Sequence, residues 1–181
     1  MKYNLEKLIK DFEKGSRYKY LFFWGHQKSK NGEITSSCFS QWWTSPFVIN
    51  DIKYPTAEHW MMAQKALLFN DNENYSKIIV AKSPAEAKAI GREVRGFDEK
   101  IWLEKREQIV IQGNLEKFKQ NKDLKTFLVN TKERILVEAS PVDRIWGIGL
   151  SSDNEKAENP KQWKGLNLLG FALMEVRDEL R

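Results

Sequence analysis

An acidic and a basic residue seven positions apart, Glu58 and Lys65, form the pair with the clearest chemical potential. Seven residues make nearly two helical turns, so both side chains would project within about 20° of each other and roughly 10 Å apart along the axis. Beside Met61, Met62 and Phe69 both groups would be partly removed from water, which disfavours their charged forms. The pair suits a general acid or base and an amine nucleophile. An ordinary pair at the edge of an apolar helix face is the alternative.

A second candidate group follows the apolar run 135–137. A strand, a turn and a second strand would bring Glu138 and Asp143 near each other at a strand end. Trp146 can stack on a flat ring, and Gly147 would allow the backbone to approach a ligand closely. A bent hairpin held by a salt bridge is the alternative.

Further candidates combine aromatic and small polar residues. Asn167 precedes the last predicted helix, where free backbone amides can hold a phosphate, with plain capping as the alternative. The stretches 23–26 and 39–43 suit a pocket for a base and, equally, an aromatic core. His26 and His59 are expected to be structural histidines.

Amphipathic helices and short extended segments must position these groups. Helices are predicted at 5–14, 56–68, 84–94, 98–120, 123–130 and 168–180. Extended segments are predicted at 20–24, 34–43, 47–54, 135–137 and 145–148. This order predicts a mainly helical α+β domain with short strands, formed by residues 1–181 as one unit.

Composition narrows the possible classes of protein. The 181 residues include seven Trp, ten Phe and five Tyr, an aromatic load that excludes bulk disorder. No apolar run approaches the ~18 residues that span a membrane, and residues 1–14 have no apolar core like that of a signal peptide. We therefore expect a cytoplasmic protein with no membrane partner.

Charged and metal-binding residues add two expectations. The 30 basic residues exceed the 25 acidic ones, giving a net charge of +5, but the two kinds alternate along the chain. Alternation favours a solvated surface over a nucleic-acid footprint. With one cysteine, Cys38, and two histidines, we expect no metal site, and we expect no cofactor.

Several short motifs are weak evidence individually but are specific when they occur together and in this order. They are Phe23-Trp24-Gly25-His26, Phe39-Ser40-Gln41-Trp42, Tyr54 to Trp60 with Gln64-Lys65-Ala66, Ser83 to Lys88 with Gly91-Arg92, Leu136 to Pro141, Asp143 to Leu150, and Trp163 to Gly170. The ordered set resembles the NADAR family, named for NAD and ADP-ribose, which includes the YbiA-like proteins. Many members have Ser-Asn-Phe where this chain has Ser40-Gln41-Trp42.

The resemblance implies a YbiA-like, mainly helical fold and hydrolysis of an N-glycosidic bond between a ribose derivative and a base. One implied substrate class is the early riboflavin intermediates, the 5-phosphoribosylamino-pyrimidines, with release of ribose 5-phosphate. Another is ADP-ribosylated guanine, and only there would nucleic acid be a partner. A non-catalytic module that binds ADP-ribose or a nucleotide is the third possibility.

The resemblance supports Glu58, Lys65 and Asp143 as the catalytic set. Glu58 would act as the acid and base. Lys65 would attack the anomeric carbon and form a Schiff base or, in a milder role, bind phosphate or ribose oxygen as a cation. Asp143 would orient the ribose hydroxyls or stabilise charge. The substrate-binding set would be Trp24, Ser40, Trp42, Arg92, Trp146, Gly147 and Asn167, whereas Trp60 and Trp102 are predicted to be core residues.

Overall fold

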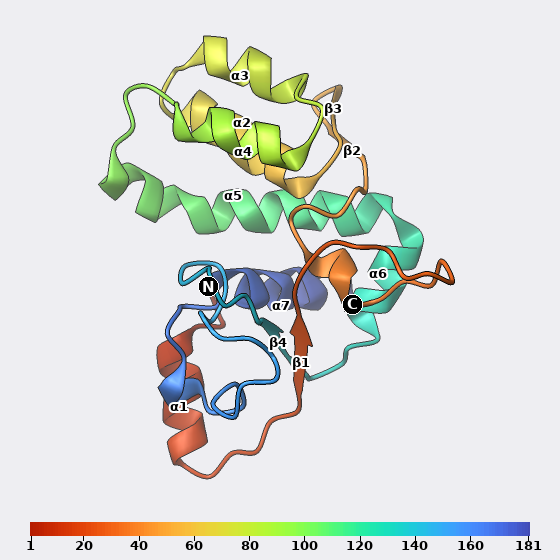
Figure 1. Ribbon diagram of the computed structural model, residues 1–181, viewed down its shortest axis with the longest axis vertical. Coiled ribbons are helices and arrows are strands. Elements are labelled where there is room, and N and C mark those ends of the chain that lie inside the picture. Colours follow the sequence, from red (N-terminus) through yellow and green to blue (C-terminus); the bar gives the residue numbers. More distant parts are fainter. The chain divides into compact units, whose positions relative to one another are not determined.

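Seven α-helices and four short strands make up the structure, a computed structural model that describes residues 1–181 (Figure 1). The helices are α1 (Leu5–Glu13), α2 (Ala57–Leu68), α3 (Asn72–Ile79), α4 (Pro84–Arg92), α5 (Glu99–Gln120), α6 (Lys122–Val129) and α7 (Leu168–Leu180). The strands are β1 (Tyr20–Phe23), β2 (Phe47–Ile49), β3 (Ile52–Tyr54) and β4 (Ile135–Glu138), and two 3₁₀ turns are η1 (Ser36–Phe39) and η2 (Pro160–Gln162). The predicted mainly helical α+β class is confirmed.

The chain divides into two units, each of which is described by itself. Unit 1 comprises Met1–Ser40 and Asp123–Arg181, and unit 2 comprises Gln41–Lys122. No helix is long and apolar enough to cross a membrane.

Unit 1 is built around two parallel strands. In the β1–β4 pair, Tyr20 lies opposite Ile135 and Phe23 lies opposite Glu138. Helix α7 packs against β4, which is buried along its apolar residues (Figure 1). The segment 145–148, predicted as a strand, forms turns instead, and the Ile148 N–H donates to the Glu138 carbonyl at 2.9 Å.

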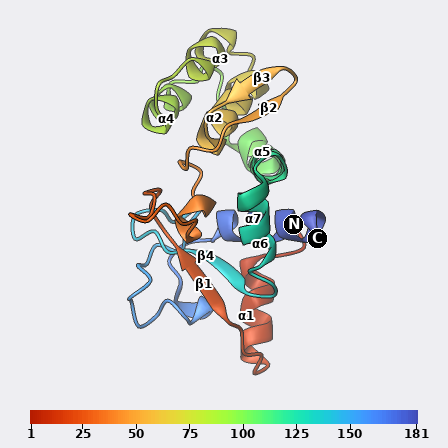
Figure 2. The ribbon, with the colours of Figure 1, turned by 90° about the vertical axis from the view of Figure 1, so that its right-hand side faces the viewer.

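Unit 2 begins with the β2–β3 hairpin and continues as a helical bundle. The hairpin turns at Asn50 and Asp51, which have φ of 50° and 63°, the left-handed values that tight hairpins need. Helix α2 is the centre of the bundle and packs against α3, α4 and α5 (Figure 2). Gly113 in α5 permits this contact, since a Cβ there would lie 2.2 Å from Cδ1 of Trp60.

Side-chain caps fix the starts of several of the predicted helices. The side chains of Thr56, Ser83 and Asp98 accept hydrogen bonds from backbone N–H groups three residues later. Two further differences from the sequence prediction concern local structure. Helix α3 was not predicted, and the segment 34–43, predicted to be extended, contains the turn η1.

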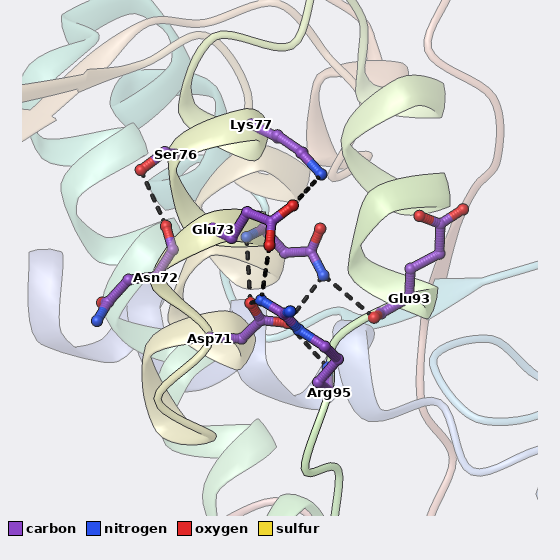
Figure 3. Close-up of polar contacts among 8 residues, drawn as sticks. Asp71, Asn72, Glu73, Ser76, Lys77, Glu93 and Arg95 are labelled. Atoms are coloured by element: carbon purple, nitrogen blue, oxygen red, sulfur yellow. Dashed lines mark hydrogen bonds and ion pairs between the residues drawn. The ribbon is translucent and has the colours of Figure 1, made fainter.

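A buried carboxylate, Asp71, ties the start of α3 to the segment that follows α4 (Figure 3). Its Oδ1 accepts from Nη2 of Arg95 at 2.7 Å, and its Oδ2 accepts from the Arg95 backbone N–H at 2.9 Å and from Asn74 Nδ2 at 2.8 Å. These bonds, led by the Arg95 guanidinium, hold the pKa of Asp71 well below its usual range. Asp71 therefore fixes the chain two residues before Phe97.

Candidate functional site

The amine of Lys65, near the end of α2, lies in a partly desolvated setting. Its Nζ donates to the Gly91 carbonyl at 2.7 Å and lies 4.5 Å from the ring centroid of Phe97 and 5.8 Å from that of Trp102. The side chain is half-buried and forms no ion pair. Burial lowers the pKa of Lys65, so a larger share of its amine is neutral than in free lysine. A neutral amine beside aromatic rings suits nucleophilic attack on a carbon electrophile.

Three elements of unit 2 build this setting around Lys65. Gly91 lets α4 approach α2 closely, since a Cβ there would lie 2.1 Å from the sulfur of Met62. Phe97 packs edge-on against Phe69 at 5.3 Å between centroids. Phe97 was not predicted from the sequence because it lies in an irregular segment. The neighbouring Gly96 is the residue type that favours a turn, and in the structure it has φ 69°.

Glu58 lies in the first turn of α2 and is 2% exposed. Its backbone N–H donates to the carbonyl of Gln41 at 3.0 Å. The side chain of Gln41 is itself buried and accepts from Asn114 Nδ2 at 2.8 Å. A carboxylate in a first helical turn is favoured by the free N–H groups there. The desolvation that spacing predicted for Glu58 is therefore present, and Lys65 forms no ion pair with it.

Two predicted substrate-binding residues of unit 2 differ in exposure. Trp42 is half-buried, and the Nζ of Lys88 lies 5.7 Å from its ring centroid. Arg92 is exposed at the end of α4 and makes no ion pair. Trp60, predicted to be a core residue, is 3% exposed and donates from Nε1 to the Ile109 carbonyl. Trp102, also predicted for the core, is half-buried and faces the amine of Lys65.

In unit 1, Asp143 organises the turn that carries Trp146. Its Oδ1 accepts from the backbone N–H groups of Ile145 and Trp146, each at 2.8 Å. Its Oδ2 makes no hydrogen bond within the protein, and no salt bridge joins Asp143 to Arg144. The salt-bridged hairpin considered from the sequence is therefore absent. Asp143 is half-buried and has an oxygen with acceptor capacity to spare.

Gly147 is buried and serves the packing of the chain against itself. A Cβ at this position would lie 2.8 Å from the carbonyl oxygen of Glu138 and 3.1 Å from that of Asp143. The Gly147 carbonyl accepts from the backbone N–H of Asn167 at 3.1 Å. The close approach that the sequence suggested is thus an approach of the protein's own backbone.

Asn167 has a structural role that differs from the predicted one. It is fully buried in the left-handed conformation, with φ 54°, and does not cap α7 with its side chain. Its Oδ1 accepts from the Glu138 N–H and its Nδ2 donates to the Leu136 carbonyl, both at 2.9 Å. The first amides of α7 donate to the carbonyls of residues 145 and 146. These two amides are therefore already engaged within the protein, and the use of this helix start for phosphate stays a prediction.

The two remaining predicted residues of unit 1 lie beside β1 and η1. Trp24 directly follows β1 and is 60% exposed. Ser40 ends η1, where its N–H donates to the Ser37 carbonyl.

His59, in unit 2, is structural as expected, with Nδ1 bonded to Thr56 Oγ1 and Nε2 to the Ala81 carbonyl. No cluster of three or more His, Cys, Asp or Glu residues is arranged to hold a metal ion.

Comparisons with known proteins point to one family. A family model described as the NADAR domain matches residues 22–181. An N-glycosidase of Acanthamoeba polyphaga mimivirus is 42% identical over 166 residues, which cover 89% of this chain and 96% of that protein. N-glycosidase YbiA of Escherichia coli (strain K12) is 32% identical over 144 residues, 80% of this chain and 79% of that protein. The NMR structure of the E. coli protein YbiA superposes with a TM-score of 0.69 at 26% identity, covering 91% of this chain and 86% of that one.

Proposed function

Because the chain belongs to the NADAR family, we propose that it hydrolyses the N-glycosidic bond of 5-phosphoribosylamino-pyrimidines, the early intermediates of riboflavin biosynthesis, and releases ribose 5-phosphate. At the level of reaction class it is an N-glycosyl hydrolase, like the relatives named N-glycosidase. The substrate is a dissolved metabolite, so the proposal includes a cytoplasmic location.

The observation that carries the proposal is the amine of Lys65. It is half-buried against aromatic rings, has a lowered pKa and forms no ion pair, while the buried carboxyl of Glu58 lies on the same helix. A sensor that only binds nucleotides has no need of a desolvated amine, because a fully charged lysine binds phosphate better. This favours catalysis over a non-catalytic module.

The proposed reaction begins with attack by the neutral amine of Lys65 on the anomeric carbon. The bond from that carbon to the nitrogen of the base breaks, and Glu58 gives a proton to the departing amine. The sugar ring then opens and leaves a Schiff base between its first carbon and Nζ of Lys65. Water, deprotonated by Glu58, adds to this Schiff base, and its hydrolysis releases ribose 5-phosphate and restores the amine.

Supporting roles follow the family resemblance. Asp143 would orient the ribose hydroxyls with its unused Oδ2, and Trp146 would stack on the base. Trp24, Ser40, Trp42 and Arg92 would contact the substrate. Gly147 and Asn167 are left out of the proposed ligand contacts, because the Gly147 carbonyl and the Asn167 side chain already bond within unit 1.

Incubation with a phosphoribosylamino-pyrimidine and, in parallel, with an ADP-ribosylated guanine oligonucleotide tests the substrate. We expect ribose 5-phosphate from the first and no ADP-ribose from the second. Release of ADP-ribose alone would show that the substrate is ADP-ribosylated nucleic acid and would contradict the proposed substrate.

Substitutions of Lys65 test its role in the reaction. Lys65→Ala should abolish turnover, and Lys100→Ala, which removes an exposed charge from α5, should leave it unchanged. Lys65→Arg keeps the positive charge but cannot form a Schiff base. Activity in this variant would therefore refute the role of Lys65 as nucleophile and would favour its role as a cation that binds phosphate. Reduction with borohydride during turnover should attach the sugar to Lys65, and turnover without such an adduct would oppose the Schiff base.

A further inference from the structure

A cavity of about 620 Å³ lies in unit 1 among the N-terminal segment, the start of β4 and α7. Its volume falls in the range of small-molecule sites. It contains none of the residues assigned above to catalysis or substrate binding. Its wall includes Tyr3, Arg17, Tyr18 and Lys19, which precede the residues 22–181 matched by the family model. The cavity therefore depends on a segment outside the part that resembles the family.

The wall of this cavity is strongly basic. Its cationic residues are Arg17, Lys19, Lys132, Arg134 and Arg177. The first four are exposed and form no ion pair. The one carboxylate in the wall, Glu133, is already bound by Arg181 at 2.7 Å. The wall thus carries five cationic residues and one carboxylate, so its net charge is positive and it would attract an anion.

Arg177 gives this wall a buried donor. The residue is 1% exposed, and its Nη1 donates to Thr131 Oγ1 at 3.0 Å and to the Arg134 carbonyl at 2.8 Å. Its Nε has no hydrogen-bond partner, and no carboxylate pairs with the guanidinium. Both bonds go to neutral oxygens, so no carboxylate lies within salt-bridge distance of the buried charge, and Asp178 and Glu133 act on it only from farther away. Burying an unpaired charge is costly, and a bound anion would offset that cost.

A smaller apolar cavity adjoins the basic one. Its volume is about 190 Å³, and it shares Tyr3, Tyr18, Ile135 and Met174 with the first cavity. The rest of its wall is formed by the apolar Leu8 and Phe171 and by the polar Asn4, Lys7 and Asp11. The Tyr3 hydroxyl donates to Asp178 Oδ2 at 2.7 Å, and the Tyr18 hydroxyl donates to Asp11 Oδ2 at 3.3 Å. These bonds hold both rings at the boundary between the two cavities.

We propose that the two cavities together form a binding site for a mononucleotide. Its phosphate would lie against the basic wall, and its flat base would occupy the apolar cavity against Tyr3 and Tyr18. Arginine and lysine are the side chains that bind phosphate, and an aromatic and aliphatic wall suits a planar ring. None of the residues in its walls is among those assigned above to catalysis or substrate binding.

Calorimetric titration of the full chain with AMP tests the site, with adenosine and inorganic phosphate as its two parts. We expect saturable binding of one AMP, tighter than that of either part. Arg17→Ala/Arg134→Ala should weaken AMP binding at least about tenfold, because two charge-assisted contacts are lost. Both side chains are exposed, and Arg177 bonds only the backbone of Arg134, so this variant should fold.

Matched variants show whether AMP binds in these two cavities. Lys100→Ala/Lys105→Ala removes two exposed charges from α5 and should leave AMP affinity unchanged. Lys65→Ala should also bind AMP normally, whereas Arg17→Ala/Arg134→Ala should retain normal N-glycosidase turnover. Tyr18→Ala should weaken AMP but not phosphate.

Four results would overturn the proposal. The first is the absence of saturable AMP binding, and the second is a loss of AMP affinity in Lys100→Ala/Lys105→Ala equal to that in Arg17→Ala/Arg134→Ala. The third is loss of AMP binding in Lys65→Ala, and the fourth is tighter binding of a single-stranded oligonucleotide than of AMP. The third result would place the nucleotide at the catalytic lysine, and the fourth would make the basic wall a nucleic-acid surface. Failure of N-glycosidase turnover with normal AMP binding would instead count against the catalytic proposal alone.

Discussion

Replacing Asn167 by alanine removes two hydrogen bonds that join the start of α7 to β4. The Glu138 N–H and the Leu136 carbonyl would each lose a partner at 2.9 Å, in a place where Asn167 itself is 0% exposed. A buried group left without a partner costs about 1–3 kcal/mol. Alanine would also have to adopt φ 54°, which costs roughly 1 kcal/mol more than asparagine. We expect a total loss of about 3–7 kcal/mol, a large share of the ~5–15 kcal/mol that stabilises a typical domain.

Two further variants separate these contributions. Asn167→Gly tolerates the left-handed conformation, so it should lose the hydrogen bonds alone and be about 1 kcal/mol more stable than the alanine variant. Asn167→Asp keeps an acceptor for the Glu138 N–H but turns an oxygen toward the Leu136 carbonyl and buries a charge. It should therefore be strongly destabilised.

Urea unfolding, followed by circular dichroism, measures these differences. Hydrogen exchange of the Glu138 amide should accelerate at the same time, because this amide loses its acceptor. Wild-type stability of Asn167→Ala with a raised KM for a phosphorylated substrate would refute the structural role. That result would restore the phosphate contact first predicted from the sequence.

Three other predictions concern unit 2. Asp71→Asn should lower the free energy of unfolding at neutral pH and reduce its decline in acid. The low pKa of Asp71, caused by Arg95, adds stability above the unfolded value of about 3.9 that is lost as pH falls through the lower folded pKa. Gly113→Ala should cost about 1–3 kcal/mol in thermal or urea unfolding, because its Cβ would lie 2.2 Å from Trp60. The rise of kcat/KM with pH that follows deprotonation of Lys65 should have its inflection below the ordinary lysine pKa of 10.5, since burial lowers the pKa of Lys65. An inflection above that value would oppose the amine nucleophile.

Local signals predicted most helices but not all the strands. Thr56 and Asp98 start helices through bonds that span three residues, and such bonds depend only on nearby sequence. Helix α3 has the same signal in Asp71, which accepts from the Asn74 N–H. The apolar run 145–148 favoured a strand, but Asp143 binds the first two amides of that run and so competes with sheet pairing.

The candidate site was predictable where spacing along one helix determines it. The periodicity of α2 indicated that Glu58 and Lys65 are both partly removed from water. Lys65 is half-buried as expected, whereas Glu58 is more deeply buried than the spacing indicated. The aromatic surroundings of the amine were not predictable, because Phe97 is placed by tertiary contacts. Asp71 binds Arg95 from another helix, and nothing in the sequence near residue 97 records that bond.

Hydrogen-bond capacity separates the structural residues of the motifs from those able to bind a ligand. Both Asn167 and Asp143 lie in the motifs that resemble the family, and sequence alone makes them equally good candidates. Asn167 uses both side-chain polar atoms on the backbone of β4 and has no exposed surface. Asp143 uses Oδ1 on its own turn but retains Oδ2 and partial exposure. Asp143 can therefore accept a hydrogen bond from a substrate hydroxyl, whereas the side chain of Asn167 is fully used in joining the start of α7 to β4.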